Sequence, residues 1–135
     1  MKTFLLEIVS PEKRLFSQEV ESVVAPAAEG MIGILSGRAP FLSSLKPGEI
    51  KVKTEGREHF FVTTGGFMEV LPEQTTLLVE SSEKADKIDK NRAKEARDRA
   101  QKRLQGSGEG IDKVRAKESL ERADARLKVA DKHQS

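Results

Sequence analysis

The chain has 135 residues, of which 24 are Lys or Arg and 22 are Asp or Glu, so its net charge at neutral pH is +2. It contains no cysteine, which excludes disulfide bonds and thiolate metal sites. Neither a secretory signal nor an apolar run long enough to span a bilayer is present. We therefore expect a soluble, cytoplasmic protein with one medium domain and an appendage.

Charged and apolar residues are distributed unevenly along the chain. Residues 1–82 contain 8 Lys or Arg and 11 Asp or Glu, a net charge of −3, whereas residues 83–135 contain 16 and 11, a net charge of +5. All six phenylalanines lie in the first part. We predict a domain with an apolar core over 1–82 and a charged helical domain over 83–135.

In the first part, apolar and polar residues alternate in short segments separated by turn signals, a pattern typical of an all-β sandwich. The segments expected as strands include 4–9, 20–25, 49–54, 61–62, 67–71 and 75–80. We predict eight to ten short antiparallel strands. Their predicted core includes Leu5, Ile8, Val20, Val23, Ile34, Ile50, Val62, Phe67, Val70, Leu77 and Val79.

Residues 88–104 and 111–127 form an internal repeat, with the closely similar sequences IDKNRAKEARDRAQKRL and IDKVRAKESLERADARL. The glycine-rich segment 105–110 between the two copies favours a turn over a continuous helix. The repeat therefore predicts an antiparallel hairpin of two α-helices. The organisation is β + α, with an N-terminal antiparallel β-sandwich followed by a C-terminal two-helix hairpin.

Each copy carries a stripe of small apolar residues when its residues are placed at helical spacing. The stripes that we expect to meet are Ala93, Ala96, Ala100 and Leu104 in the first copy and Ala116, Leu120, Ala123 and Leu127 in the second. Alanine buries little apolar area, so this contact supplies only a few kcal/mol against the entropy of ordering the segment. We expect a hairpin that opens and closes, helped by the glycines at 106, 108 and 110.

Arginines flank both stripes, and the two-fold relation between equivalent antiparallel helices places all of them on one face. They are Arg92, Arg99 and Arg103 in the first copy and Arg115, Arg122 and Arg126 in the second. One interpretation is a solvated face paired with Glu95, Glu118 and Glu121. The other is a ligand site, because aligned guanidinium groups repel one another unless an anion or an acidic partner faces them.

The first part offers little chemistry. His59 lacks the Cys or clustered carboxylates of a metal site, and so does His133 of the second part, which lies in what we expect to be a frayed C-terminus. No nucleophile elbow is present, and the glycine pair within 30–34 is not followed by a helical pattern. We expect no catalysis in this domain.

Three segments match motifs of one family: EGMIGILSGRAP at 29–40, GGFMEV at 65–70 and IDKNRA at 88–93. With these motifs in this order and at these separations, the chain resembles the epsilon subunit of bacterial F-type ATP synthases over essentially its whole length. Ser36 and Arg38 stand where many members have Pro and His.

The resemblance implies a ten-stranded β-sandwich followed by two helices, in a non-catalytic rotor subunit of the central stalk. It implies that the sandwich binds the gamma subunit and the c-ring. The hairpin would fold on the sandwich or extend toward the alpha and beta catalytic subunits, where the extended form inhibits ATP hydrolysis. The implied location is the cytoplasmic face of the cell membrane, as a peripheral part of a proton-translocating enzyme, without insertion into the membrane.

The resemblance also implies that ATP, with or without Mg²⁺, binds the folded hairpin as a regulatory ligand. The family's nucleotide site corresponds here to Glu83, Ile88, Asp89 and Ala93 around the adenine and to Arg92, Arg99, Arg122 and Arg126 toward the ribose and phosphates. Arg103 and Arg115 have no counterpart in the motif. From its position alone, Asp89 has a second interpretation, as an acidic residue that stabilises a helix N-terminus beside Asp86.

Two other classes of function fit this sequence less well. A nucleic-acid-binding β-domain with a basic helical arm is the alternative, but residues 83–135 contain no aromatic residue to stack on a base, and eleven acidic residues dilute their positive charge. A small ATP hydrolase would need a phosphate loop, a metal-binding carboxylate pair and a positioned base, which the sequence lacks.

Overall fold

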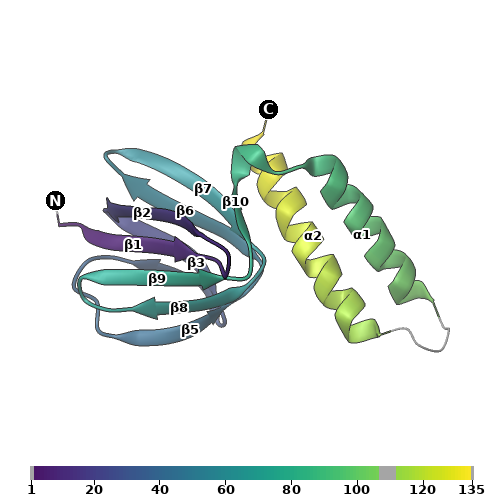
Figure 1. Ribbon diagram of the computed structural model, residues 1–135, viewed down its shortest axis with the longest axis horizontal. Helices are drawn as coiled ribbons and strands as arrows, with labels where there is room; N and C mark the ends of the chain where they lie inside the picture. Colours follow the sequence, from purple (N-terminus) through teal and green to yellow (C-terminus); the bar gives the residue numbers. More distant parts are fainter. Residues whose placement is uncertain (1, 107–111, 135) are drawn as a thin grey trace.

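The computed structural model describes residues 2–106 and 112–134. Within them the chain forms a ten-stranded β-sandwich followed by an antiparallel pair of α-helices that lies beside it (Figure 1). This confirms the predicted β + α organisation. Most of the predicted turn between the helices, including the glycines at 108 and 110, lies outside the described residues.

All the strands are short. They are β1 (Phe4–Val9), β2 (Arg14–Val20), β3 (Ser22–Ala27), β4 (Gly30–Ile34), β5 (Phe41–Leu45), β6 (Gly48–Thr54), β7 (Arg57–Thr63), β8 (Gly66–Val70), β9 (Gln74–Val79) and β10 (Ser82–Lys84). The helical elements are the 3-10 helix η1 (Ala85–Lys87), α1 (Lys90–Gln105) and α2 (Lys113–His133). The domain boundary predicted after Ser82 lies within β10, which pairs with β7.

One sheet folds over on itself to give the two layers of the sandwich (Figure 1). The strand order is β10-β7-β6-β3-β5-β8-β9-β1-β2, and β4 pairs with β3. The strands β2 and β6 lie close enough for side-chain contacts. Thr54 of β6 donates a hydrogen bond to the Glu19 carbonyl of β2 (2.9 Å) and accepts one from Gln18 (3.3 Å). The pair β1–β9 is parallel rather than antiparallel as expected, which is possible because a long stretch of chain connects the two strands.

The core lies between the two layers; two residues of the predicted list are not buried in it, and a third is buried as predicted but in a different cluster. In β1 the buried residues are Phe4, Leu6 and Ile8, so Leu5 points to the opposite face and is half-buried. Phe67 is 57% exposed, because its neighbours on either side of the pleat set the opposite phase in β8. Val62 is buried in a second apolar cluster, beneath the helices.

Glycine at position 66 is required by the close approach of β9. A Cβ atom there would overlap the carbonyl oxygen of Leu78 and the Cα of Val79, and the φ of +146° is rarely adopted by residues with side chains. Backbone packing therefore explains the second glycine of the GGFMEV segment.

Arg38 is held within its own loop. Its Nη1 donates a hydrogen bond to the Gly33 carbonyl (2.9 Å), and its guanidinium carbon lies 5.2 Å from the centroid of the Phe41 ring. The Arg38 side chain thus joins the end of β4 to the start of β5.

The helix α2 lies between the sandwich and α1 (Figure 1). Toward the sandwich it contributes to the second apolar cluster, which consists of Val62, Ala85, Ile88, Ala125, Val129 and Ala130, with Phe60 packed against it. Toward α1 it meets the predicted alanine stripe. The buried residues of that stripe are Ala93, Ala100, Ala116, Ala123 and Leu127, while Ala96, Leu104 and Leu120 are half-buried. The predicted helix contact is confirmed at most of its positions.

The C-terminal end of α2 is not frayed, contrary to expectation. His133 is the last residue of the helix, and its ring stacks on Phe60 with a centroid distance of 3.9 Å. Its Nε2 also contacts a carboxylate oxygen of Glu49. These contacts fix the helix end against β6 and β7.

Candidate functional site

A cleft of about 360 Å³ lies where β10, the beginning of α1 and the second half of α2 meet. Its lining is rich in arginine and carboxylate side chains. The lining residues are Ser81, Glu83, Asp89, Arg92, Ala93, Ala96, Arg99 and Arg126. Because three separate elements contribute, the cleft exists only while the hairpin is docked on the sandwich.

Asp89 lies at the beginning of α1. It is the N-cap residue, and its Oδ1 accepts a hydrogen bond from the backbone N–H of Arg92 (3.0 Å). Of the two interpretations of Asp89, its role at the helix N-terminus is therefore confirmed. Asp89 also lines the cleft, so a role toward a ligand is compatible with the cap.

The side chains of α1 that line the cleft follow from helical spacing. Arg92, Ala96 and Arg99 are separated by four and three residues, so they lie on one face of the helix. Both arginines are exposed, and within the described residues neither forms an ion pair. Two guanidinium groups are therefore available to an anion along this wall.

Arg126 connects α2 to β10 across the cleft. Its Nε donates to Glu83 Oε1 at 2.9 Å, and its Nη2 donates to Ser81 Oγ at 3.3 Å. The Ser81 hydroxyl lies in turn 2.8 Å from the Thr64 hydroxyl. The Arg126 and Glu83 side chains are about two-thirds shielded from solvent, so this pair is less screened than a surface ion pair.

Three guanidinium groups and two carboxylates line the cleft, which favours a ligand with several anionic oxygens and some hydrogen-bond donors. The arginine forks suit phosphate or carboxylate oxygens, and the carboxylates can accept from amino groups. Ala93 and Ala96 provide a small apolar surface on the α1 side.

Six of the eight residues predicted to bind nucleotide line this cleft. They are Glu83, Asp89, Arg92, Ala93, Arg99 and Arg126. Ile88 lies beside the cleft but is buried in the second apolar cluster, where it anchors the turn before α1.

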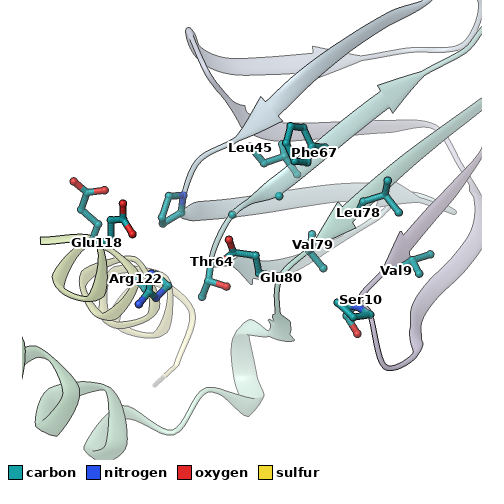
Figure 2. Close-up of a pocket in the computed structure, with 15 residues that line it drawn as sticks. Val9, Ser10, Leu45, Thr64, Phe67, Leu78, Val79, Glu80, Glu118 and Arg122 are labelled. Carbon is teal, nitrogen blue, oxygen red and sulfur yellow. The ribbon is translucent and has the colours of Figure 1, made fainter. Parts of the chain in front are cut away.

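Arg122 lies elsewhere. It lines a different pocket of about 710 Å³ between α2 and the edge of the sandwich, opposite Thr64 and Glu80 (Figure 2). Its Nη2 donates a hydrogen bond to Ser119 Oγ at 3.0 Å. Arg122 precedes Arg126 by four positions, an axial displacement of about 6 Å, and it does not line the cleft.

The six arginines do not form one continuous cluster around the cleft. Arg103 and Arg115 are exposed and do not line it. The pairing expected with Glu95, Glu118 and Glu121 is also not observed among the described residues. Between residues of the two helices, the ion pairs observed in the described part of the chain join Lys90 to Asp131 and Arg97 to Asp98.

Two lining residues were not predicted. Ser81 precedes β10, and no local pattern indicates that an arginine 45 positions later will donate to it. Ala96 was assigned to the helix contact, but it is half-buried and faces the cleft. Both residues reach the cleft only through the docking of the hairpin on the sandwich, which local sequence patterns do not indicate.

Within residues 2–106 and 112–134, no group of three or more His, Asp or Glu side chains is arranged to hold a metal ion. In the same part of the chain, neither α1 nor α2 combines the length and the apolar character that a membrane-spanning helix needs.

Comparison with known families covers nearly the whole chain. Residues 3–85 match the family model of the ATP synthase delta/epsilon chain, beta-sandwich domain. Residues 86–131 match that of the ATP synthase delta/epsilon chain, long alpha-helix domain.

Curated relatives and solved structures agree with these matches. The ATP synthase epsilon chain of Syntrophobacter fumaroxidans is 46% identical over 127 residues, which is 94% of this chain and 95% of the relative. That of Desulforamulus reducens is 45% identical over 107 residues, 79% of this chain and 81% of the relative.

A similar fold occurs in a chain of the Euglena gracilis mitochondrial ATP synthase, with a TM-score of 0.82 at 21% identity over 97% of this chain and 82% of that one. A chain from the central stalk and c-ring structure of the Tetrahymena thermophila mitochondrial ATP synthase gives a TM-score of 0.60 at 16% identity, over 99% of this chain and 98% of that one. At these identities the structures establish the fold, and the curated relatives establish the family. The chain belongs to the ATP synthase epsilon chain family.

Proposed function

We propose that this protein is a non-catalytic rotor subunit in the central stalk of a bacterial proton-translocating F-type ATP synthase. The match of both domains to the family, over residues 3–85 and 86–131, carries this proposal. The similar solved chains come from structures described as containing F1 and a c-ring, and as a central stalk with its c-ring. The sandwich then binds the gamma subunit and the c-ring, and the protein is peripheral on the cytoplasmic face of the cell membrane.

We further propose that ATP is the regulatory ligand of the cleft lined by Glu83, Asp89, Arg92 and Arg126. The observation that supports this is the convergence of arginines from both helices with carboxylates from β10 and the α1 cap. Arg92 and Arg99 bind phosphate oxygens, and Arg126 exchanges its Glu83 partner for phosphate. The Glu83 and Asp89 carboxylates then accept hydrogen bonds from the adenine amino group.

The cleft provides a physical route from ATP to regulation. A ligand that contacts β10, α1 and α2 together has affinity for the docked hairpin and little for the extended one, so it shifts the population toward the docked form. The extended form lays its arginines against acidic surface on the alpha and beta subunits and inhibits ATP hydrolysis. The apolar contacts of the hairpin are small, an alanine stripe between the two helices and one cluster against the sandwich, which keeps the two forms close in free energy.

The test of the ATP site compares Arg126 with Arg103, the residue at the equivalent position of the first repeat. ATP is titrated into the full chain and the binding measured by calorimetry and by NMR shifts at the cleft. Arg126→Ala should raise the Kd at least tenfold, the effect expected for losing one charge-assisted contact of about 1.5–3 kcal/mol. Arg103→Ala removes an exposed guanidinium outside the cleft and should change the Kd less than twofold. Equal effects of the two substitutions would place the nucleotide elsewhere.

The inhibitory role is tested in the assembled enzyme with a triple substitution of Arg115, Arg122 and Arg126 by Ala. The rate of ATP hydrolysis should rise, because the extended hairpin loses three cations that face acidic surface. The matched control replaces three exposed lysines, Lys94, Lys102 and Lys117, by Ala and should leave the rate unchanged. Normal assembly with unchanged hydrolysis in the arginine variant would contradict the proposal.

A further inference from the structure

Three consecutive residues at the end of α2, Asp131, Lys132 and His133, contact three other elements. Asp131 pairs with Lys90 at the start of α1, with an Nζ–Oδ1 distance of 2.7 Å. Lys132 and His133 both contact the carboxylate of Glu49 in β6. The His133 ring stacks on Phe60 of β7 with an interplanar angle of 23°. The helix end therefore holds the hairpin and the sandwich in one arrangement.

Gln134 adds a contact to the segment that joins the sandwich to the hairpin. Its side-chain Nε2 donates to the carbonyl oxygens of Ala85 (2.9 Å) and Ile88 (3.0 Å). Its backbone N–H donates to the Ala130 carbonyl (2.7 Å), so the residue is itself fixed to α2. One amide group thus spans the two ends of η1.

The carbonyls that accept these bonds belong to a turn with few other anchors. η1 is only three residues long, and no side chain caps its N-terminus. The side chains of Ala85 and Ile88 are 4% and 5% exposed, so the turn lies against the apolar cluster and water competes poorly for its carbonyls. Removing the Gln134 amide leaves two carbonyl oxygens without these donors.

The same turn sets the separation between the two carboxylates of the cleft. Glu83 precedes η1 in β10, and Asp89 follows it as the cap of α1. The backbone between them is the segment that Gln134 holds at both ends. Fixing this segment to α2 also fixes both carboxylates relative to Arg126, which projects from the same helix.

We propose that Gln134, supported by His133, is a positioning residue of the cleft: it holds the Ala85–Ile88 turn so that Glu83 and Asp89 face the arginines. The proposal rests on the proposed function where it names ATP as the ligand, whereas the contacts stand without it. Residues 132–134 lie beyond the segment that the helix-domain family model matches, which ends at residue 131.

The test uses the full chain with Gln134→Met, which keeps the length of the side chain but cannot donate. A second variant, His133→Leu, removes the stacking and the contact with Glu49. The matched control is Lys128→Met, an exposed cation one to two turns earlier on the same helix. Each protein is measured twice, by amide hydrogen exchange without nucleotide and by ATP titration.

In Gln134→Met we expect amide exchange of residues 85–92 to become at least fivefold faster without ATP, while the amides of 123–129 change less than twofold. The Kd for ATP should rise about five- to tenfold, as expected for losing one to two net hydrogen bonds. His133→Leu should change both quantities in the same direction, and Lys128→Met neither. A variant that merely loosens the hairpin would accelerate exchange in 123–129 as much as in 85–92.

Unchanged exchange at 85–92 in Gln134→Met overturns the proposal, and so does faster exchange there with an unchanged Kd. Uniformly faster exchange over both segments overturns it as well, because Gln134 would then act only on docking. If the unsubstituted chain binds no ATP, the proposed function fails and the role of Gln134 toward ATP fails with it. Fast exchange confined to 85–92 would in that case still establish the hold on the turn.

Discussion

The two helices of the hairpin have nearly the same sequence but different surroundings. Each begins with an aspartate N-cap, Asp89 in α1 and Asp112 in α2, and each cap accepts a hydrogen bond of 3.0 Å from the backbone N–H three residues later. Each also buries alanines at equivalent positions of the repeat. Local structure is thus repeated along with the sequence.

The surroundings differ because α2 has a second buried face. Lys102 of α1 is exposed, whereas its equivalent Ala125 is buried against the sandwich. α2 also extends beyond the repeat, where Val129 and Ala130 join the same apolar cluster. A few substitutions and an added turn therefore convert a helix with one apolar stripe into one that connects α1 to the sandwich.

The arginines of the two helices also have different surroundings, and this difference decides which of them line the cleft. Arg103 and Arg126 occupy equivalent positions, but Arg103 is exposed while Arg126 lies 2.9 Å from Glu83 and lines the cleft. The repeat supplies guanidinium groups at regular intervals, and docking determines which of them face a ligand. The comparison of the two helices can be tested by exchanging their residues.

The largest effect is expected when Ala125, which faces the sandwich in α2, is replaced by lysine, the residue at the equivalent position of α1. Ala125→Lys places a long cation in the apolar cluster, and overpacking together with desolvation should destabilise docking by about 2–4 kcal/mol. Amide exchange of α2 measures this loss. The reverse change, Lys102→Ala, alters an exposed position and should stay within about 0.5 kcal/mol of the parent. Similar effects of the two changes would show that α2 is not the docked helix.

The contact between the helices should be less sensitive, because both copies share it. Ala123→Leu adds volume at a position that is 1% exposed, so the helices must separate, at a cost of about 1–3 kcal/mol. Ala100→Leu, at the equivalent position, should have the same effect to within a factor of two. Gln101→Leu, on the exposed side of α1, is the control. Amide exchange of both helices is the measurement, and a cost confined to one of the two variants would contradict a symmetric contact.

A smaller effect is expected at the helix caps. Asp89→Ala and Asp112→Ala each remove one N-cap, and each should lower the stability of its helix by about 1 kcal/mol, measured by amide exchange in the first turn. Only Asp89 lines the cleft, so only its substitution should also weaken ATP binding. If both variants bind ATP as the parent does, Asp89 is a cap and nothing more.

Features that depend on neighbours in sequence could be predicted. The fold class, the alanine stripe and the shared face of Arg92 and Arg99 all follow from helical or strand periodicity. The phase of a strand could not be read where apolar residues are adjacent. Phe4, Leu5 and Leu6 are consecutive, and so are Phe67 and Met68, so either alternation fits the sequence.

Features that depend on docking could not be predicted. The Arg126–Glu83 pair joins residues 43 positions apart, and the contacts of His133 join residues at least 73 apart. Nor does the repeat indicate that Arg122 faces the sandwich while Arg126 faces the cleft. Both outcomes follow from how α2 is seated, which its Ala125–Ala130 face and its C-terminal contacts determine.

The smallest effect is expected at the ion pair between Lys90, at the beginning of α1, and Asp131, near the end of α2. The Lys90 ammonium donates a hydrogen bond to Asp131 at 2.7 Å and holds the pKa of that carboxyl below its usual value. Asp131 lies in the last turn of α2, where the helix dipole disfavours a negative charge, so the attraction of Lys90 is the stronger effect. A carboxylate whose pKa is lowered by folding contributes stability above its unfolded-state pKa of about 4, and this contribution is lost as the pH falls through the folded-state value.

Asp131→Asn should therefore lower hairpin stability slightly at pH 6, and the difference from the parent, followed by thermal unfolding in steps of pH, should vanish toward pH 3. It should also shrink in high salt, because the pair is exposed. Lys90→Met should reproduce the effect, whereas Lys113→Met, at the equivalent exposed position of α2, should not. A difference between Asp131→Asn and the parent that grows as the pH falls would show that the charge of Asp131 opposes docking.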